Sequence, residues 1–93
     1  MDETFTKYFL NNDWVIQGEK NSAIKHFQFK DFKTAFSWMT IIAIIAEKQD
    51  HHPEWKNIYN KVEVVLTTHD EGGLSKKDLY LAKAVDNEFK KYS

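Results

Sequence analysis

The sequence predicts an α+β fold in which a four-stranded antiparallel sheet has helices packed on one face. Four short runs with strand character occur as two closely connected pairs, and a long amphipathic helix separates the pairs. A further helical segment precedes the first pair, and another follows the second. An antiparallel sheet with its helices on one face buries the apolar sides of these elements economically. Residues 1–93 are therefore expected to form a single domain.

The N-terminal third predicts a short helix followed by a β-hairpin. Aromatic residues at helical spacing favour a helix over Thr4–Leu10, and a cluster of polar turn residues ends it. Trp14–Gln17 and Ala23–Phe29 have strand character and are predicted to pair. Alternation along the second strand places its phenylalanines toward the core and His26 on the opposite face, where a solvated surface histidine is expected.

The longest predicted element is a helix that Asp31 caps and that ends near Gln49. Pro53 disfavours helical geometry at His52, so the helix must stop at the histidine pair. Apolar residues at spacings of three and four mark the predicted core face: Phe32, Ala35, Phe36, Met39, Ala43 and Ala46. A second apolar stripe lies on a different side: Trp38, Ile41 and Ile45. This stripe fits two interpretations equally, burial against another subunit or a wide core face.

The C-terminal half predicts a second strand pair and a last helix. Asn57–Tyr59 and Lys61–Thr68 are the expected strands, joined tightly around Asn60. A glycine-containing loop follows, and Ser75 with Asp78 then forms a capping box, for which a structural role is sufficient. The inward-facing residues expected in the last helix are Leu79, Ala82, Val85 and Phe89.

Composition excludes several classes of function. The 13 basic and 14 acidic residues are dispersed without a basic stripe, so nucleic-acid binding has no electrostatic support. The absence of cysteine excludes disulfides, thiolate metal sites and cysteine nucleophiles, and makes the cytoplasm the expected compartment. Neither a secretory signal nor an apolar run long enough to cross a bilayer is expected.

Three histidines are the candidate catalytic residues: His51, His52 and His69. Histidine titrates near neutrality, so a cluster of three favours proton-transfer chemistry. Glu47 lies one helical turn before His51, and it is expected, together with the helix C-terminal carbonyls, to favour a charged His51. Zinc binding is disfavoured because adjacent helical residues point about 100° apart and cannot easily converge on one ion. A nucleophilic hydrolase also lacks its usual motif, which leaves metal-free acid and base chemistry.

Several segments together carry a family resemblance: Trp14, Phe27–Phe32, Glu47, the run His51-His52-Pro53-Glu54-Trp55, Asn57–Val62, Thr67-Thr68-His69, Gly73-Leu74-Ser75 and Asp78. This multipart pattern extends from Trp14 to about Ala84 and resembles that of the pterin-4a-carbinolamine dehydratases. The resemblance implies an enzyme that converts 4a-hydroxytetrahydropterin to quinonoid dihydropterin, which recycles the pterin cofactor of aromatic amino acid hydroxylases. It also implies homodimers or homotetramers and neither a metal nor an organic cofactor.

The resemblance places catalysis on the three histidines. It places pterin contacts on the following residues: Asp50, His51, His52, Thr67, Thr68, His69 and Asp70. Dehydration needs an acid for the departing hydroxyl and a base for the N5 proton. We expect His51 and His69 to be the acids and His52 to orient the pterin or accept the proton. Glu47 is expected to orient His51, and Trp55 either flanks the site or fills the core.

Two other functions remain open from the sequence. Animal members of the resembled family also serve as dimerisation cofactors of a homeodomain transcription factor, and related proteins act as assembly factors. Such a binding role is expected to use the helix face around Trp38, Ile41 and Ile45, without the histidines. A three-histidine metal hydrolase is the remaining alternative, which a stoichiometric bound ion would indicate.

Overall fold

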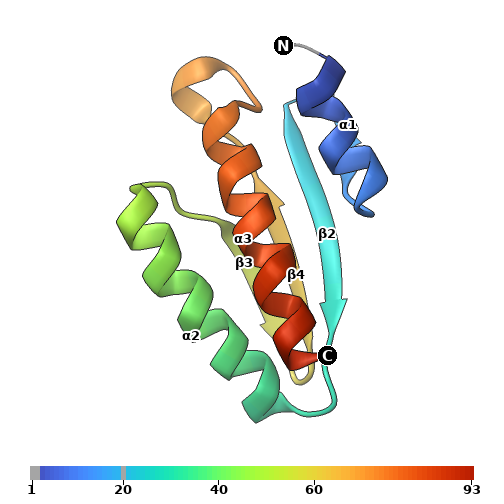
Figure 1. Cartoon of the computed structure of the whole chain (residues 1–93), viewed down its shortest axis with the longest axis vertical. Helices are drawn as coiled ribbons and strands as arrows, with labels where there is room; N and C mark the ends of the chain where they lie inside the picture. Colours follow the sequence, from blue (N-terminus) through green and yellow to red (C-terminus); the bar gives the residue numbers. More distant parts are fainter. Residues whose placement is uncertain (1–2, 20) are drawn as a thin grey trace.

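The structure is a computed structural model that describes residues 3–19 and 21–93 (Figure 1). In chain order its elements are α1 (Glu3–Asn11), β1 (Val15–Gln17), β2 (Ser22–Gln28), α2 (Phe32–Gln49), β3 (Glu54–Ile58), β4 (Lys61–Leu66), the 3₁₀ turn η1 (His69–Glu71) and α3 (Lys76–Tyr92). This order and the all-antiparallel sheet confirm the predicted α+β class. Within these described residues, no helix is long and apolar enough to cross a membrane.

The strands pair antiparallel in the order β1-β2-β4-β3, so the two predicted hairpins join along β2 and β4. The last hairpin turns at Asn60 and resumes at Lys61 as predicted, but its outer ends are shifted, because β3 begins at Glu54 and β4 ends at Leu66. The turn occupies Tyr59 and Asn60, with Tyr59 in the left-handed region at a φ of 52°. This shift places Trp55 inside β3, opposite Val64, and makes Glu54 the first strand residue after the histidine pair.

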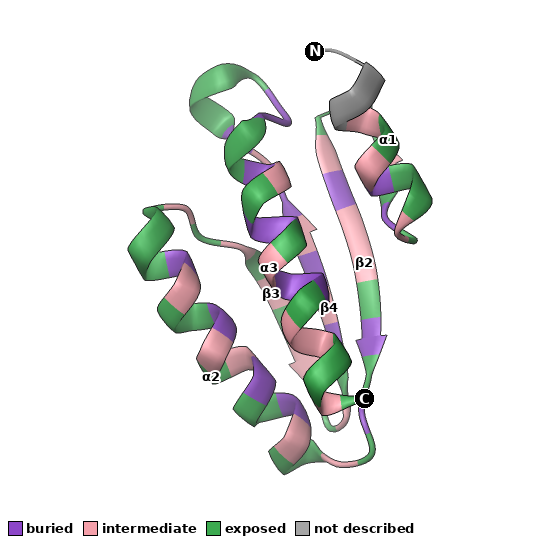
Figure 2. Cartoon of the chain, viewed as in Figure 1, coloured by how far each residue is buried: buried purple, intermediate pink, exposed green. Residues whose placement is uncertain are grey.

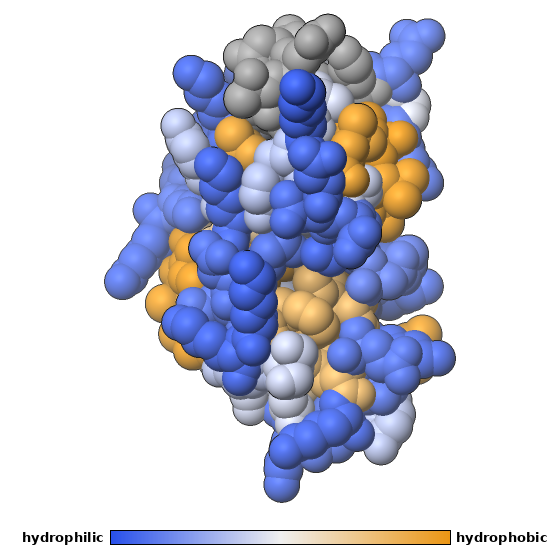
Figure 3. Space-filling model, turned by 45° about the vertical axis from the view of Figure 1, so that its right-hand side comes forward, coloured by the Kyte–Doolittle hydropathy of each residue, from blue (hydrophilic) through white to orange (hydrophobic). Residues whose placement is uncertain are grey.

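Helices α2 and α3 pack side by side over the sheet, and α1 lies beyond β2 (Figure 1). The buried bands of α2 and α3 alternate with exposed ones along each helix, as Figure 2 shows. Hydrophilic side chains cover most of the face seen in Figure 3, with smaller hydrophobic areas between them. On the strands, every second residue of β4 is buried: Val62, Val64 and Leu66. The predicted phenylalanines Phe27 and Phe29 join them, while the side chain of His26 is exposed beside Glu63. The core therefore lies between the helices and one sheet face.

The buried face of α2 differs from the predicted one. Its buried residues are Ala35, Trp38, Ile42 and Ala46. Phe32 and Phe36 were predicted in the core, but they are 47% and 54% exposed, and Ala43 is exposed as well. Trp38 was assigned to the second stripe, yet it is completely buried, and its ring centroid lies 4.9 Å from that of Phe27. The aromatic contact with the sheet therefore sets the rotation of α2.

A buried carboxylate connects α1 and the first hairpin to α3. Asp86 Oδ2 accepts hydrogen bonds from Tyr8 Oη at 2.7 Å and from Trp14 Nε1 at 3.0 Å. Asp86 Oδ1 pairs with Lys25 Nζ at 2.7 Å. Burial raises the pKa of Tyr8, and the hydrogen bond to Asp86 raises it further. This cluster holds Tyr8 in its neutral, donating form and fixes α1 against α3.

Replacing the buried indole should destabilise the protein far more than replacing an exposed ring of the same helix. Trp38→Ala is expected to lower the free energy of unfolding by about 3–5 kcal/mol, because it leaves a large cavity. Phe36→Ala should cost at least about 2 kcal/mol less, since that ring is half exposed. Urea unfolding followed by circular dichroism measures both values. Equal losses would contradict the observed rotation of α2.

Removing the Tyr8 hydroxyl should change the pH dependence of stability. At neutral pH, Tyr8→Phe is expected to cost about 1 kcal/mol for the lost hydrogen bond. Because folding raises the Tyr8 pKa, the folded state keeps a proton that the unfolded tyrosine releases above about pH 10. Above that pH, the free energy of unfolding of the wild type should therefore fall more steeply than that of Tyr8→Phe, and the difference between the two proteins should shrink. Urea titrations from pH 7 to 11 test this, with exposed Tyr59→Phe as the control; a constant difference contradicts it.

Candidate active site

His51 lies at the junction that follows α2. Asp50 leaves the helix in a left-handed conformation, with φ 53°, and its amide donates to the last helical carbonyls. The next residue turns toward α3, where His51 Nε2 lies 2.6 Å from Asp78 Oδ1. The His51 side chain is only 10% exposed and that of Asp78 is completely buried. His51 is thus an imidazole held by a carboxylate in an environment largely shielded from solvent.

Asp78 has a second set of partners that completes its burial. Its Oδ2 accepts from the Thr68 hydroxyl at 2.6 Å and from the Ser75 amide at 3.0 Å. The second of these bonds belongs to the predicted capping box, which the structure confirms. The interpretation of Asp78 as only a cap was incomplete, because its other oxygen contacts His51. A signal was present in the sequence, since a capping-box carboxylate needs only one of its two oxygens for the cap.

His52, and not His51, is the histidine that pairs with Glu47. Its Nε2 lies 2.5 Å from Glu47 Oε1, and both side chains are more than half exposed. The prediction that Glu47 orients His51 was therefore wrong. The i, i+4 relation holds only while the chain remains helical, and α2 ends at Gln49, before His51.

His69 opens η1, and its Nε2 lies 3.3 Å from Glu54 Oε2. Both side chains are exposed, at 82% and 62%, so solvent screens this pair. Sequence reasoning missed Glu54 as a partner because the contact depends on the pairing of β3 with β4, which sets Glu54 beside Val65. Each of the three candidate histidines therefore faces one carboxylate, and each carboxylate comes from a different element.

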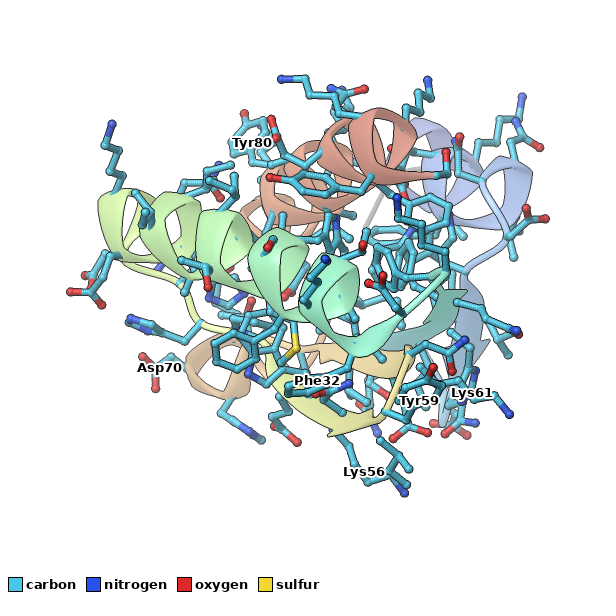
Figure 4. All side chains as sticks on the ribbon, turned by 90° about the horizontal axis from the view of Figure 1, so that it is seen from below. Phe32, Lys56, Tyr59, Lys61, Asp70 and Tyr80 are labelled. Atoms are coloured by element: carbon cyan, nitrogen blue, oxygen red, sulfur yellow. The ribbon has the colours of Figure 1, made fainter. Side chains whose placement is uncertain are left out.

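His51 and His69 border two separate hollows in the surface. One is lined by Gln49, His51, Lys77 and Tyr80. The other is lined by Asn21, Ser22, Glu54, Val65, Thr67, His69, Gly72 and Gly73. In the view of Figure 4, Tyr80 and Asp70 lie on opposite sides of α2. Thr68, which follows β4 and precedes His69, connects the two regions through its bond to Asp78.

The remaining predicted site residues have distinct environments. Asp50 and Asp70 are exposed, and the hydroxyl of Thr67 donates to the carbonyl of Asn21 at 2.5 Å. Thr68 was predicted as a pterin contact, but it is only 5% exposed and its hydroxyl bonds within the protein. Trp55 is half-buried and packs against the core, which agrees with its predicted role in filling the core.

The positions of the candidate histidines bear on metal ligation. Across the part of the chain that the structure describes, no three His, Asp or Glu side chains converge as a metal-binding group. His51, His52 and His69 instead point to separate carboxylates. The donor set is thus arranged as individual imidazole–carboxylate pairs, which suits proton transfer.

Two bacterial proteins are similar to this chain over most of its length. A protein of Rhodospirillum rubrum, provisionally named a pterin-4-alpha-carbinolamine dehydratase, is 51% identical over 74 residues, which cover 80% of this chain and 77% of that protein. A protein of Jannaschia with the same provisional name is 56% identical over 71 residues, covering 76% of this chain and 71% of that one.

Solved structures share the fold. A transcriptional coactivator/pterin dehydratase from Brucella melitensis superposes with a TM-score of 0.85 at 38% identity, covering 95% of this chain and 96% of that one. A pterin dehydratase-like protein identified as a RuBisCO assembly factor superposes with a TM-score of 0.72 at 19% identity, over 83% of this chain and 89% of that one, and shows the fold alone. The family model described as pterin 4 alpha carbinolamine dehydratase matches residues 1–88, so this chain belongs to that family.

Proposed function

We propose that the protein dehydrates 4a-hydroxytetrahydropterin to quinonoid dihydropterin, which returns the pterin cofactor of aromatic amino acid hydroxylases to use. The observation that carries this proposal is the nearly buried His51, held at 2.6 Å by the Asp78 carboxylate. Family membership and the two further histidine–carboxylate pairs support it. A protein that acts only by binding a partner has no need of three such pairs.

The proposed reaction breaks the C4a–O bond and removes the N5 proton. An imidazolium protonates the departing hydroxyl, which leaves as water, and a base takes the proton from N5 as the C4a–N5 double bond forms. We assign the acid role to His51 and His69, and we assign orientation of the ring or acceptance of the N5 proton to His52. Each proton transfer of this kind contributes typically 10²–10⁴ in rate. The reaction involves no net oxidation or reduction, so proton transfer alone is sufficient.

The surroundings of the histidines suggest how the pterin is held. His69 shares its hollow with Thr67 and the glycine pair 72–73. Asp50, just before His51, and Asp70, just after His69, are both exposed. We assign pterin contacts to these residues and to the histidines. Glu47 supports His52 through its direct contact, a role that replaces the expected support of His51.

Alanine variants of the histidines test the proposed activity. A pterin-dependent hydroxylase generates the 4a-hydroxy compound in place, and its decay is followed by absorbance. Wild type should accelerate the decay, whereas His51→Ala and His69→Ala should each lower kcat by about 10²–10⁴. Exposed His26, which pairs with Glu63 on the outer sheet face, provides the matched control, and His26→Ala should retain full activity.

Chelation separates this proposal from a metal-dependent one. Treatment with EDTA should leave the rate unchanged, because the proposed steps use only side-chain acids and bases. Loss of activity on chelation, restored by a stoichiometric metal ion, contradicts the assignment. A wild type that leaves the decay unchanged while folded contradicts the dehydratase function itself.

We also propose that the exposed side of α2 joins two copies of the chain. The large apolar residues on this side are Phe32, Phe36 and Ile44, between 47% and 54% exposed. The rings of Phe32 and Phe36 lie 5.8 Å apart and form a continuous apolar surface. These residues replace the predicted set of Trp38, Ile41 and Ile45, because Trp38 is in the core. The coactivator part of the Brucella protein's name favours a surface of this kind as a second, binding function.

A charge on this surface should dissociate the copies. Phe36→Asp is expected to shift the mass measured by light scattering after gel filtration toward that of one 11.0 kDa chain, since burying an unpaired carboxylate is costly. Leu10→Asp is the matched control, because Leu10 is 59% exposed on α1, which lies on the opposite side of the molecule from α2 (Figure 1). An unchanged mass for folded Phe36→Asp would place the contact elsewhere.

A further inference from the structure

We propose that Asp78, Thr68 and Ser75 are positioning residues that keep the neutral His51 ring in its Nε2–H form, so that Nδ1 is the nitrogen that exchanges protons with substrate. The catalytic consequence rests on the proposed dehydratase function. The positioning itself follows from the buried hydrogen bonds and can be measured independently.

The partners of each hydroxyl in this cluster determine which group donates and which accepts in every hydrogen bond. The Ser75 hydroxyl oxygen accepts from the Lys77 amide at 3.2 Å and lies 2.7 Å from the Thr68 hydroxyl. Thr68 has one hydroxyl hydrogen, and Asp78 Oδ2 accepts it at 2.6 Å. The Ser75 hydroxyl hydrogen is therefore the one that points to the Thr68 oxygen. Every hydroxyl in the cluster thus has both a donor and an acceptor role filled.

This order leaves Asp78 as an acceptor only. Its Oδ2 receives the Thr68 hydroxyl and the Ser75 amide, and its position in the first turn of α3 favours negative charge. Its Oδ1 then accepts from His51 Nε2, which must carry the hydrogen of that 2.6 Å bond. Nδ1 of His51 is consequently the ring nitrogen that gains or loses a proton. A neutral imidazole presents Nδ1 as a base, and an imidazolium presents it as an acid.

Thr68 is better suited to this role than to contact with substrate. Its amide donates to the Gly73 carbonyl at 3.0 Å, and its carbonyl accepts from the amides of Gly73 and Glu71. Together with the hydroxyl bonds, these contacts occupy the polar atoms of a residue that is 5% exposed. Thr68 also begins the loop that carries His69, so the same buried cluster orients His51 and fixes the base of the His69 loop.

The ring form of His51 can be read from long-range ¹⁵N–¹H NMR spectra at a pH where the ring is neutral. Wild type should show hydrogen on Nε2 and a hydrogen-free Nδ1. Thr68→Val keeps the volume but removes the hydroxyl, so the buried Asp78 carboxylate loses a donor and its protonated form is favoured. A protonated Asp78 can donate to His51 Nε2, so the two ring forms of His51 should mix. Thr68→Ser should preserve the wild-type spectrum. Thr67→Val is the spectral control, because the Thr67 hydroxyl bonds to Asn21 and not to Asp78.

The same variants should separate in activity. Thr68→Val is expected to lower kcat roughly 10- to 100-fold with KM changed less than about twofold, because the ring is misaligned while the binding surface remains. Thr68→Ser should stay within about threefold of wild type, a rescue that a packing defect alone does not produce. Asp78→Asn provides a second variant, and it should also lose the preference for the Nε2–H form.

The outcomes distinguish this inference from the proposed function. If folded Thr68→Val keeps both the wild-type ring form and the wild-type kcat, or if Thr68→Ser fails as badly as Thr68→Val, the positioning role is overturned. If wild type shows the expected ring form and Thr68→Val loses it, while neither protein dehydrates the pterin, the positioning stands and the dehydratase function falls.

Discussion

The rest of the candidate site depends on the buried carboxylate of Asp78. A completely buried charge is tolerated only when hydrogen bonds satisfy it, and donors from three segments do so here. They come from the end of α2, from the segment after β4 and from the start of α3. These segments must therefore assemble together, because losing any one donor leaves the carboxylate undersatisfied. Local helix capping and the orientation of the His51 imidazole consequently share one side chain.

The three histidine–carboxylate pairs differ in how firmly they are held. The pair of His51 is shielded, whereas the partners of His52 and His69 are more than half exposed. Exposed pairs contribute little to stability and rearrange at small cost. The imidazole of His51 is thus fixed by the core, whereas those of His52 and His69 can change position at small cost. Such a division suits the proposed dehydration, in which two protons move at different positions of one substrate.

Helix α3 organises the domain through two buried carboxylates on one side. Asp78 connects it to the histidine site, and two turns later Asp86 connects it to Tyr8, Trp14 and Lys25. Among the described residues, no buried side-chain nitrogen or oxygen lacks a hydrogen-bond partner. Both acids therefore specify which elements meet α3, in addition to the apolar packing. The site and the N-terminal helix are consequently attached to the same rigid element.

The order of elements, the end of α2 at the histidine pair and the capping box at Asp78 could all be predicted from the sequence, because they follow from local backbone preferences and spacing. Which stripe of α2 is buried depends instead on how the helix packs against the sheet. Helical periodicity relates residues on one helix but does not say which side meets the sheet. Phe36 was therefore predicted in the core but is exposed, whereas Trp38 was predicted on the second stripe but is buried. The partner of His51 was decided in the same way. Asp78 lies 27 residues further along the chain, and only the packing of α3 against the end of α2 brings the two together.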